Sequence, residues 1–283
     1  MADIDIDHLK TWIGKEETAE DVVTHTPVKA LAATLDRDDP EPRDGDALPP
    51  LWHWLYFLPI YRISAGGPDG HATRGGFLPP VPLPRRMWAG SRIAFHKPLR
   101  VGEAIKRVSR VDDVTMKTGR AGPLVFVTAR HEITSAGGGA ITEFHDIAYR
   151  AAARPGEAAP AGLAAPETSA WRRDIAPDDV LLFRYSALTF NSHRIHYDRR
   201  YVTEVEGYPG LVVHGPLIAT LLIDLVRRNT GAPVVSFDFR ATKPLFDIAP
   251  FSARGQPGAD GKIDVWAQDA RGDLCMRAEV GLG

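Results

Sequence analysis

The sequence predicts an α+β protein built from two related halves, and three observations lead to this fold class. Residues 216–228 have the apolar periodicity of a buried helix, whereas the runs that follow alternate with the period of strands. A Lys-Pro-Leu turn between two strand-like runs occurs twice, at 97–99 and 243–245. Between the two copies, residues 151–169 are rich in alanine, proline and glycine, which is typical of a linker.

Composition and charge limit the class of protein further. The chain has 283 residues, 44% hydrophobic and 25% charged, so it can bury an ordinary core. Its 34 basic and 36 acidic side chains nearly cancel, which argues against nucleic acid or an anionic membrane as a partner. The single cysteine, Cys275, excludes an intrachain disulfide and indicates a reducing compartment, most simply the cytoplasm. No apolar run approaches the ~20 residues of a membrane span.

The second half is expected to contain, in order, a strand, a polar loop, one long helix and a meander of strands. Val180 to Tyr185 are expected as the first strand, which leads into the polar run 188–198. The helix 216–228 places its apolar side chains on one face, and Arg227 and Arg228 suit its last turn. The four later strands are expected in the runs PVVSFDFRAT, PFSARGQ, KIDVWAQDA and LCMRAEVGL.

The first half is expected to repeat this order. Its strands are predicted within 92–110, 123–134 and 142–153, and PLWHWLYFLPIY (50–61) is the candidate for the equivalent helix. A coincidence between two β-rich halves is the alternative to a true repeat. We divide the chain into an N-terminal half, 1–152, an Ala/Pro-rich linker, 153–168, and a C-terminal half, 169–283.

The run LTFNSHRIHYD (188–198), called the histidine run below, contains several ionisable and polar groups between apolar flanks. His193 and His196 are three residues apart, which is compatible with zinc, but a zinc site needs a third ligand. His214 could supply it, although nothing in the sequence requires this, and we expect no metal. A plainer interpretation makes Asn191 a helix N-cap and His196 a satisfied polar residue.

A second run, VVHGPL, places Gly215 at the N-terminus of the long helix. A backbone N–H at such an end is an oriented donor, suited to a carbonyl oxygen that gains negative charge. Glycine also lets a ligand approach the backbone closely. The two runs together therefore offer an acid/base group and an oxyanion donor.

The two runs resemble those of the MaoC-like, hydratase-2 family of acyl-thioester hydratases and dehydratases. The family loop reads roughly Gly-Asp-x-Asn-Pro-Leu-His-x-Asp, and His196 and Asp198 match its histidine and its closing acid. Asn191 falls where the family has its catalytic aspartate. The 24 residues from Asn191 to Gly215 match the family spacing from that aspartate to the helix glycine.

The departures from the family loop point to a subgroup. His193 and Arg194 replace the Asn-Pro of the family, and this version is similar to that of two-hotdog chains. These include mitochondrial 3-hydroxyacyl-thioester dehydratase type 2 and bacterial mesaconyl-CoA and itaconyl-CoA hydratases. The run PLPRRMWAGSRIAFHKPLRVGE resembles their N-terminal half. The resemblance implies a double hotdog, each half a long helix wrapped by an antiparallel sheet, with a degenerate N-terminal half that forms the acyl or CoA tunnel.

The resemblance also implies the reaction, the reversible hydration of an enoyl-CoA. His196 would act as general base, Gly215 N–H as oxyanion donor, and Asn191 would orient the water because an amide cannot take its proton. The acyl-CoA is the substrate, so no cofactor is expected, and a homo-oligomer is compatible with the sequence. Side chains that could contact CoA or a substrate carboxylate, as in mesaconyl-CoA or itaconyl-CoA, are Arg85, Arg86, His193 and Arg194.

Two other functions remain open at this point. A hotdog thioesterase would attack the same thioester carbonyl with a carboxylate or an activated water. A non-catalytic acyl-thioester-binding protein would use the histidine run only as structure.

Overall fold

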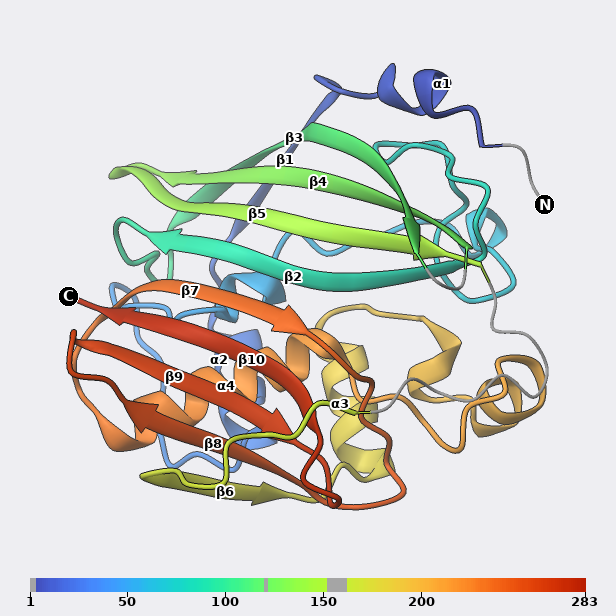
Figure 1. Ribbon diagram of the computed structural model, residues 1–283. Coiled ribbons are helices and arrows are strands. Elements are labelled where there is room, and N and C mark those ends of the chain that lie inside the picture. The colour runs from blue at the N-terminus through green and yellow to red at the C-terminus, as the bar shows by residue number, and fades with distance from the viewer. Residues whose placement is uncertain (1–3, 120–121, 152–161) are drawn as a thin grey trace.

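A computed structural model describes residues 4–119, 122–151 and 162–283, whose strands form one ten-stranded antiparallel sheet (Figure 1). The strand order is β1-β3-β4-β5-β2-β7-β10-β9-β8-β6, so each half contributes five adjacent strands. Read from its outer edge inward, each half has the same order of strands, which confirms the predicted repeat. The strands are β1 Glu16–Val22, β2 Arg85–Phe95, β3 Ala104–Gly119, β4 Gly122–Ser135, β5 Gly138–Arg150, β6 Trp171–Ile175, β7 Val234–Ala241, β8 Phe251–Pro257, β9 Lys262–Gln268 and β10 Leu274–Leu282.

The two halves join where β2 pairs with β7. The register runs from Gly90 opposite Arg240 to Ala94 opposite Ser236. A Cβ at Gly90 would lie 2.2 Å from the carbonyl oxygen of Phe239, so the close approach of the strands requires glycine here. The Lys-Pro-Leu turns follow the ends of β2 and β7, and thus occupy equivalent places in the two halves.

The helix predicted over 216–228 is confirmed as α4, Gly215–Asn229. Ten consecutive residues of α4, 217–226, are buried, because the second half of the sheet wraps around the helix (Figure 1) and other chain segments cover its remaining face. The other helices are shorter: α1 Ile6–Lys10, α2 His25–Thr34 and α3 Asp179–Leu188, with single turns at η1 Trp52–Leu55, η2 Ile63–Ala65, η3 Arg194–His196 and η4 Tyr201–Val205.

The strand expected at Val180 to Tyr185 is wrong, since these residues belong to α3. The carboxylate of Asp178 caps the helix by accepting from Leu181 N–H at 2.8 Å. Leu182 and Tyr185 are buried on one helical face, three residues apart. A short apolar run fits a strand or a helix equally well, and here the cap decides between them.

The helix expected over 50–61 is also wrong, because only η1 forms there. The residues of η1 instead contact a buried carboxylate of β5, Glu143, which is 3% exposed. Glu143 accepts from Ser91 Oγ at 2.9 Å and from Trp54 Nε1 at 3.1 Å, and it contacts His53 Nε2 at 3.2 Å. Burial raises the pKa of Glu143, but the bond to His53 and the charges of His53, His131 and His145 hold it well below its usual range. The expected long helix is therefore present in the second half alone.

The segment between the halves is described only in part. Of the expected linker 153–168, residues 153–161 lie outside the described residues. The remainder attaches to the second half, where Leu274 N–H donates to the carbonyl of Leu163 at 2.7 Å and Ala165 N–H donates to that of Gly272 at 2.9 Å. None of the helices in the described part of the chain combines the length and the apolar content that a membrane crossing requires.

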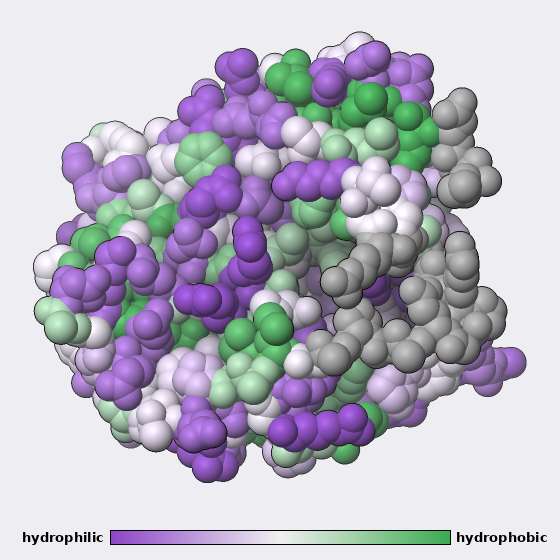
Figure 2. Space-filling model, in the orientation of Figure 1, coloured by the Kyte–Doolittle hydropathy of each residue, from purple (hydrophilic) through white to green (hydrophobic). Residues whose placement is uncertain are grey.

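A smaller apolar cluster lies farther along the same face of the first half of the sheet as the main core. Leu9 of α1 packs there against Val81, Leu83 and the strand residue Val111. Figure 2, in the orientation of Figure 1, shows hydrophobic residues gathered at the upper right beside α1. The first half thus has two apolar clusters along one face of its sheet, and α1 closes the smaller one.

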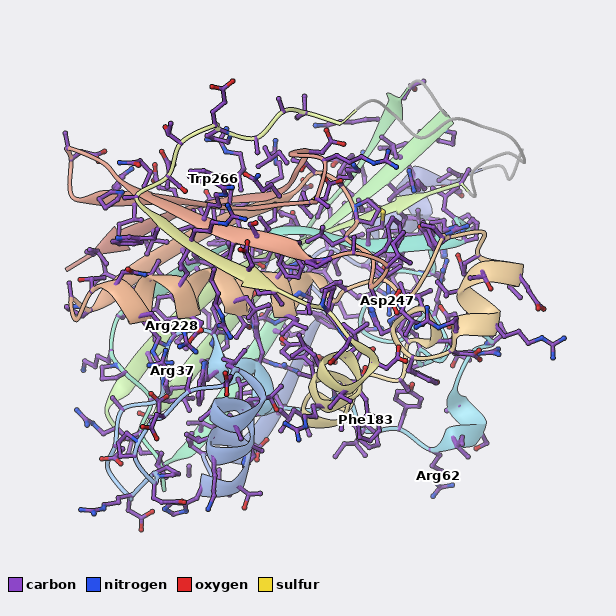
Figure 3. The ribbon with its side chains drawn as sticks, turned by 90° about the horizontal axis from the view of Figure 1, so that it is seen from below. Arg37, Arg62, Phe183, Arg228, Asp247 and Trp266 are labelled. Atoms are coloured by element: carbon purple, nitrogen blue, oxygen red, sulfur yellow. The ribbon has the colours of Figure 1, made fainter. Side chains whose placement is uncertain are left out.

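A buried ion cluster ties the two halves together around α4. Asp224 is 1% exposed and accepts from Arg37 Nη1 at 2.6 Å, Arg173 Nη1 at 2.5 Å and Arg228 Nε at 2.7 Å. Arg173 and Arg228 each also donate to the carbonyl of Leu35 in the first half. Figure 3 shows Arg37 and Arg228 together on the side of α4 that faces away from the strands of the second half. Removal of this carboxylate would leave three guanidinium groups without their shared partner.

We therefore expect Asp224→Asn to lower the free energy of unfolding by about 3–5 kcal/mol, the usual cost of breaking a buried ion pair. Equilibrium denaturation in urea measures the change. The matched control is Asp179→Asn, whose carboxylate is 73% exposed and pairs with Arg199, and for which about 1 kcal/mol or less is expected. Equal losses for the two variants would contradict a central role for the Asp224 cluster.

Candidate active site

The end of α3 sets the position of Asn191. Phe190 adopts a left-handed conformation with φ of 48° and ends the helix. Phe190 N–H then donates to the carbonyl of Ala187 at 3.4 Å and Asn191 N–H to that of Ser186 at 2.8 Å, the bonding pattern of a Schellman motif. Glycine normally holds the left-handed position, so this backbone is strained at a non-glycine residue. The strain turns the chain abruptly out of α3 and into the histidine run.

The side chain of Asn191 organises the first residues of that run. Its Oδ1 accepts from the backbone N–H of His193 at 3.0 Å. The amide group is thereby fixed in orientation, and its Nδ2 is left as the donor that could hold a water or a substrate oxygen. The N-cap considered for Asn191 is thus replaced by a local turn, which precedes the single turn η3.

His196 is held by two hydrogen bonds between the histidine run and the segment before α4. Its Nδ1 lies 2.7 Å from the carbonyl oxygen of Val212, and Val212 N–H donates to the carbonyl of Ile195 at 3.0 Å. A carbonyl can only accept, so Nδ1 carries the proton and Nε2 is the basic nitrogen. The structure therefore fixes both the orientation of the ring and its tautomer.

The segment that supplies this carbonyl is itself held on its other side. Val213 N–H donates to the carbonyl of Leu245 at 2.9 Å, and Leu211 N–H donates to Asp247 Oδ1 at 2.8 Å. Asp247 in turn pairs with Arg199, which follows the histidine run. Figure 3 shows Asp247 beside the loops at the end of the sheet, away from the charged cluster of α4.

Ring stacking brings His196 to the N-terminus of α4. The rings of His196 and His214 are stacked with centroids 3.7 Å apart and planes 19° apart. His214 is fully buried, bonds Ser186 Oγ through Nε2 at 2.8 Å, and directly precedes Gly215, the first residue of α4. A Cβ at Gly215 would meet no atom within 4 Å, so there is open space for a ligand next to this helix end.

The electrostatic environment keeps the histidines of the site neutral. Burial lowers the pKa of His196 to about 4, although the bond to Val212 opposes the shift. Burial likewise lowers the pKa of His193 to about 2, and the pKa of His214 well below its usual range. A neutral imidazole with a free Nε2 can accept a proton at neutral pH, which is what a general base requires.

A loop of the first half closes over the histidine run. Arg194 N–H donates to the carbonyl of Asp69 at 2.9 Å, its Nη1 donates to that of Pro68 at 3.0 Å, and Ser192 Oγ donates to that of Gly70 at 2.6 Å. Gly70 has φ of +88°, and a Cβ there would lie 1.9 Å from the Ser192 carbonyl oxygen. Only glycine permits this contact.

The same loop brings an acid and a histidine beside His193. His71 Nδ1 lies 3.2 Å from Asp69 Oδ2, and the rings of His71 and His193 are 4.1 Å apart. One ligand atom from each of Asp69, His71 and His193 lies within 4.8 Å of the others, so this trio could hold a metal ion. Two of its members, His71 and Asp69, already form a hydrogen-bonded pair.

The sequence offered no reason to choose Asp69 and His71, because they lie more than 115 positions before the histidine run. The segment GGPDGHATRGG is rich in glycine, which is the one local signal of a tight, functional loop.

The three arginines selected from the sequence differ in their surroundings. Arg85 forms an ion pair with Glu206, and Arg194 bonds Asp198 Oδ2 through Nη2 at 2.7 Å and through Nε at 3.0 Å. Among the residues that the structure describes, Arg86 has no ion pair and makes no hydrogen bond to a carboxylate. The structure thus gives two of these guanidinium groups a partner inside the protein.

These parts define a class of protein. A hotdog sheet around a buried helix, a neutral imidazole base, a fixed amide and an accessible helix N-terminus make a hydratase/dehydratase of acyl thioesters, which is a carbon–oxygen lyase.

Comparison with known proteins agrees with this class. Residues 51–247 match the family of hydroxyacyl-thioester dehydratase type 2, and the chain belongs to this family. It is 49% identical to mesaconyl-C(4)-CoA hydratase of Chloroflexus aurantiacus, over 96% of this chain and 97% of that protein. It is 27% identical to the mitochondrial hydroxyacyl-thioester dehydratase type 2 of Schizosaccharomyces pombe, over 82% and 87% of the chains. A MaoC-like dehydratase from Phytophthora capsici shares the fold, with 14% identity, a TM-score of 0.66 and 99% coverage of both chains.

The pKa of His196 makes the pH profile of hydration a direct test of its environment. The base must be neutral, and the neutral form is present above its pKa and lost below it. We expect kcat/KM to stay level from neutral pH down to about pH 5 and to fall through the pKa of about 4. Initial rates with crotonyl-CoA measure this, and samples returned from acid to pH 7 control for unfolding. An inflection near the ordinary value of about 6.5 would show that the imidazole is solvated instead.

Proposed function

We propose that this chain adds water reversibly across the α,β double bond of a short enoyl-CoA, and that mesaconyl-C(4)-CoA is its substrate. The observation that carries the reaction is the neutral, oriented imidazole of His196 next to the N-terminus of α4. The identity of 49% to a mesaconyl-C(4)-CoA hydratase, over nearly the full length of both chains, supports the choice of substrate. The CoA thioester is the substrate, and the chemistry needs no cofactor.

In the hydration direction, His196 Nε2 takes a proton from water while the water oxygen bonds to Cβ. The electron pair of the double bond moves toward the thioester, whose carbonyl oxygen gains negative charge. Gly215 N–H, strengthened by the dipole of α4, stabilises this enolate. The proton on Nε2 then passes to Cα, which completes the addition and restores the neutral base.

Asn191 replaces an ionisable residue with an amide of fixed orientation. Because its Oδ1 accepts from His193 N–H, Nδ2 is the group that can donate to the attacking water and hold its lone pair toward Cβ. A single base then serves both proton transfers. This chain would thereby perform with one histidine what the wider family does with a histidine and an aspartate.

A thioesterase is the second candidate, because it would act on the same carbonyl. It needs a carboxylate or an activated water aimed at that carbon. The first turn of α4 contains no acidic residue, and His196 has no carboxylate bonded to it in the described part of the chain. We therefore favour hydration over hydrolysis.

We expect His196→Ala to lower kcat/KM for enoyl-CoA hydration by about 10²–10⁴-fold, the usual contribution of a general base. Asn191→Ala is expected to lower it by about 10²-fold, since the water is no longer oriented. Loss of the enoyl-thioester absorbance measures hydration, and a thiol reagent in parallel samples measures release of CoA.

The matched control is His25→Ala, which removes a half-exposed histidine paired with Asp44, and it should keep full activity. Thermal melting checks that every variant is folded. Near-normal turnover by folded His196→Ala would refute the mechanism. Stoichiometric thiol release by the unmodified protein would establish the thioesterase instead.

A further inference from the structure

Arg86 stands out among the basic residues near the site because none of the carboxylates that the structure describes pairs with it. Its neighbour Arg85 pairs with Glu206, Arg194 pairs with Asp198, and Arg74 donates to the carbonyls of Val81 and Pro84. In the part of the chain that the structure describes, Arg86 is half-buried and has no ion pair. A partly buried cation is stable when an anion accompanies it, so a ligand is the natural source of one.

Strand geometry directs Arg86 into the first half of the molecule. Successive side chains of β2 point to opposite faces, which separates Arg86 from Arg85. Arg86 lies opposite Tyr149 of β5, and its charge opposes the rise in pKa that burial causes at this tyrosine. Two residues along β2, Trp88 packs against His145 with ring centroids 4.0 Å apart. Arg86 therefore adjoins a compact aromatic wall.

The charge of Arg86 also reaches the residues that flank the catalytic histidine. Burial is the main cause of the lowered pKa of His71 and of His193, and the charge of Arg86 adds to both shifts. The His193 ring lies 4.1 Å from that of His71 and 5.4 Å from that of His196. The His193 ring thus contacts both His71 and the general base.

This position fits an anion on the acyl group better than a phosphate of CoA. The pantetheine arm separates the CoA phosphates from the thioester, and the thioester must lie at Gly215 for the enolate to be stabilised. A carboxylate attached to Cβ, in contrast, remains beside the base.

We propose that Arg86 binds the free carboxylate of a short dicarboxylic acyl group. This inference rests on the proposed function for the identity of the reacting group. A guanidinium group binds a carboxylate through two parallel N–H donors, and a charge so placed selects dicarboxylic over plain enoyl thioesters. Arg86 is then the residue that determines specificity, separate from the proton chemistry of His196.

The test compares Arg86→Gln with the unmodified protein on two substrates, mesaconyl-C(4)-CoA and crotonyl-CoA. Loss of a charged hydrogen-bonded contact should lower kcat/KM for mesaconyl-C(4)-CoA by about 10- to 100-fold and change that for crotonyl-CoA by less than about threefold. Arg86→Lys should recover part of the loss, since it restores the charge without the bidentate geometry. Arg85→Gln is the matched control and should affect the two substrates equally.

A binding measurement separates this proposal from the proposed function. Calorimetry with two inert saturated thioesters, methylsuccinyl-CoA and butyryl-CoA, should show a preference for the dicarboxylic one that Arg86→Gln abolishes. If the unmodified protein binds in this way but hydrates neither enoyl thioester, the function is wrong and the Arg86 site stands. Equal effects of Arg86→Gln on both ligands, or no effect on either, would overturn the assignment of Arg86, provided that thermal melting shows the variant to be folded.

Discussion

The arrangement of the site depends on the pair of hydrogen bonds between Val212 and the histidine run. One of them sets the tautomer of His196, and the other, from Val212 N–H to the Ile195 carbonyl, keeps the run in place. Because Val212 lies three residues before Gly215, the same contacts hold the base next to the helix N-terminus. The chain thus couples the position of its proton acceptor to that of its oxyanion donor through one short segment.

The continuous sheet determines which groups each half contributes to the site. Pairing of β2 with β7 makes the ten strands continuous, and it carries the loop of Asp69 and His71 across to the histidine run. The catalytic groups come from the second half, while the first half supplies a covering loop and the unpaired charge of Arg86. The first half lacks the long helix whose N-terminus stabilises the oxyanion in the second half, and it buries the polar side chain of Glu143 instead. This is consistent with a supporting role for the first half.

The parts of the fold that could be predicted are those whose cause is local. The helix after Gly215 and eight of the ten strands follow from periodicity, whereas the edge strands β1 and β6 were not expected. The placing of His196 and Gly215 in one site follows from the resemblance to the family loop. The helix α3 was missed because its apolar run resembles a strand, and only the cap by Asp178 distinguishes it. The contacts of the first-half loop join residues more than 120 positions apart, so no local pattern in the sequence reveals them.

The central claim is that His196 is a neutral base whose proton lies on Nδ1. Nitrogen NMR of the protein labelled with ¹⁵N-histidine measures this directly, with His196→Gln used to assign the signal. At pH 7 the account predicts a neutral ring, with Nδ1 protonated and Nε2 bearing the lone pair. An imidazolium at that pH, or a neutral ring protonated on Nε2, would contradict it.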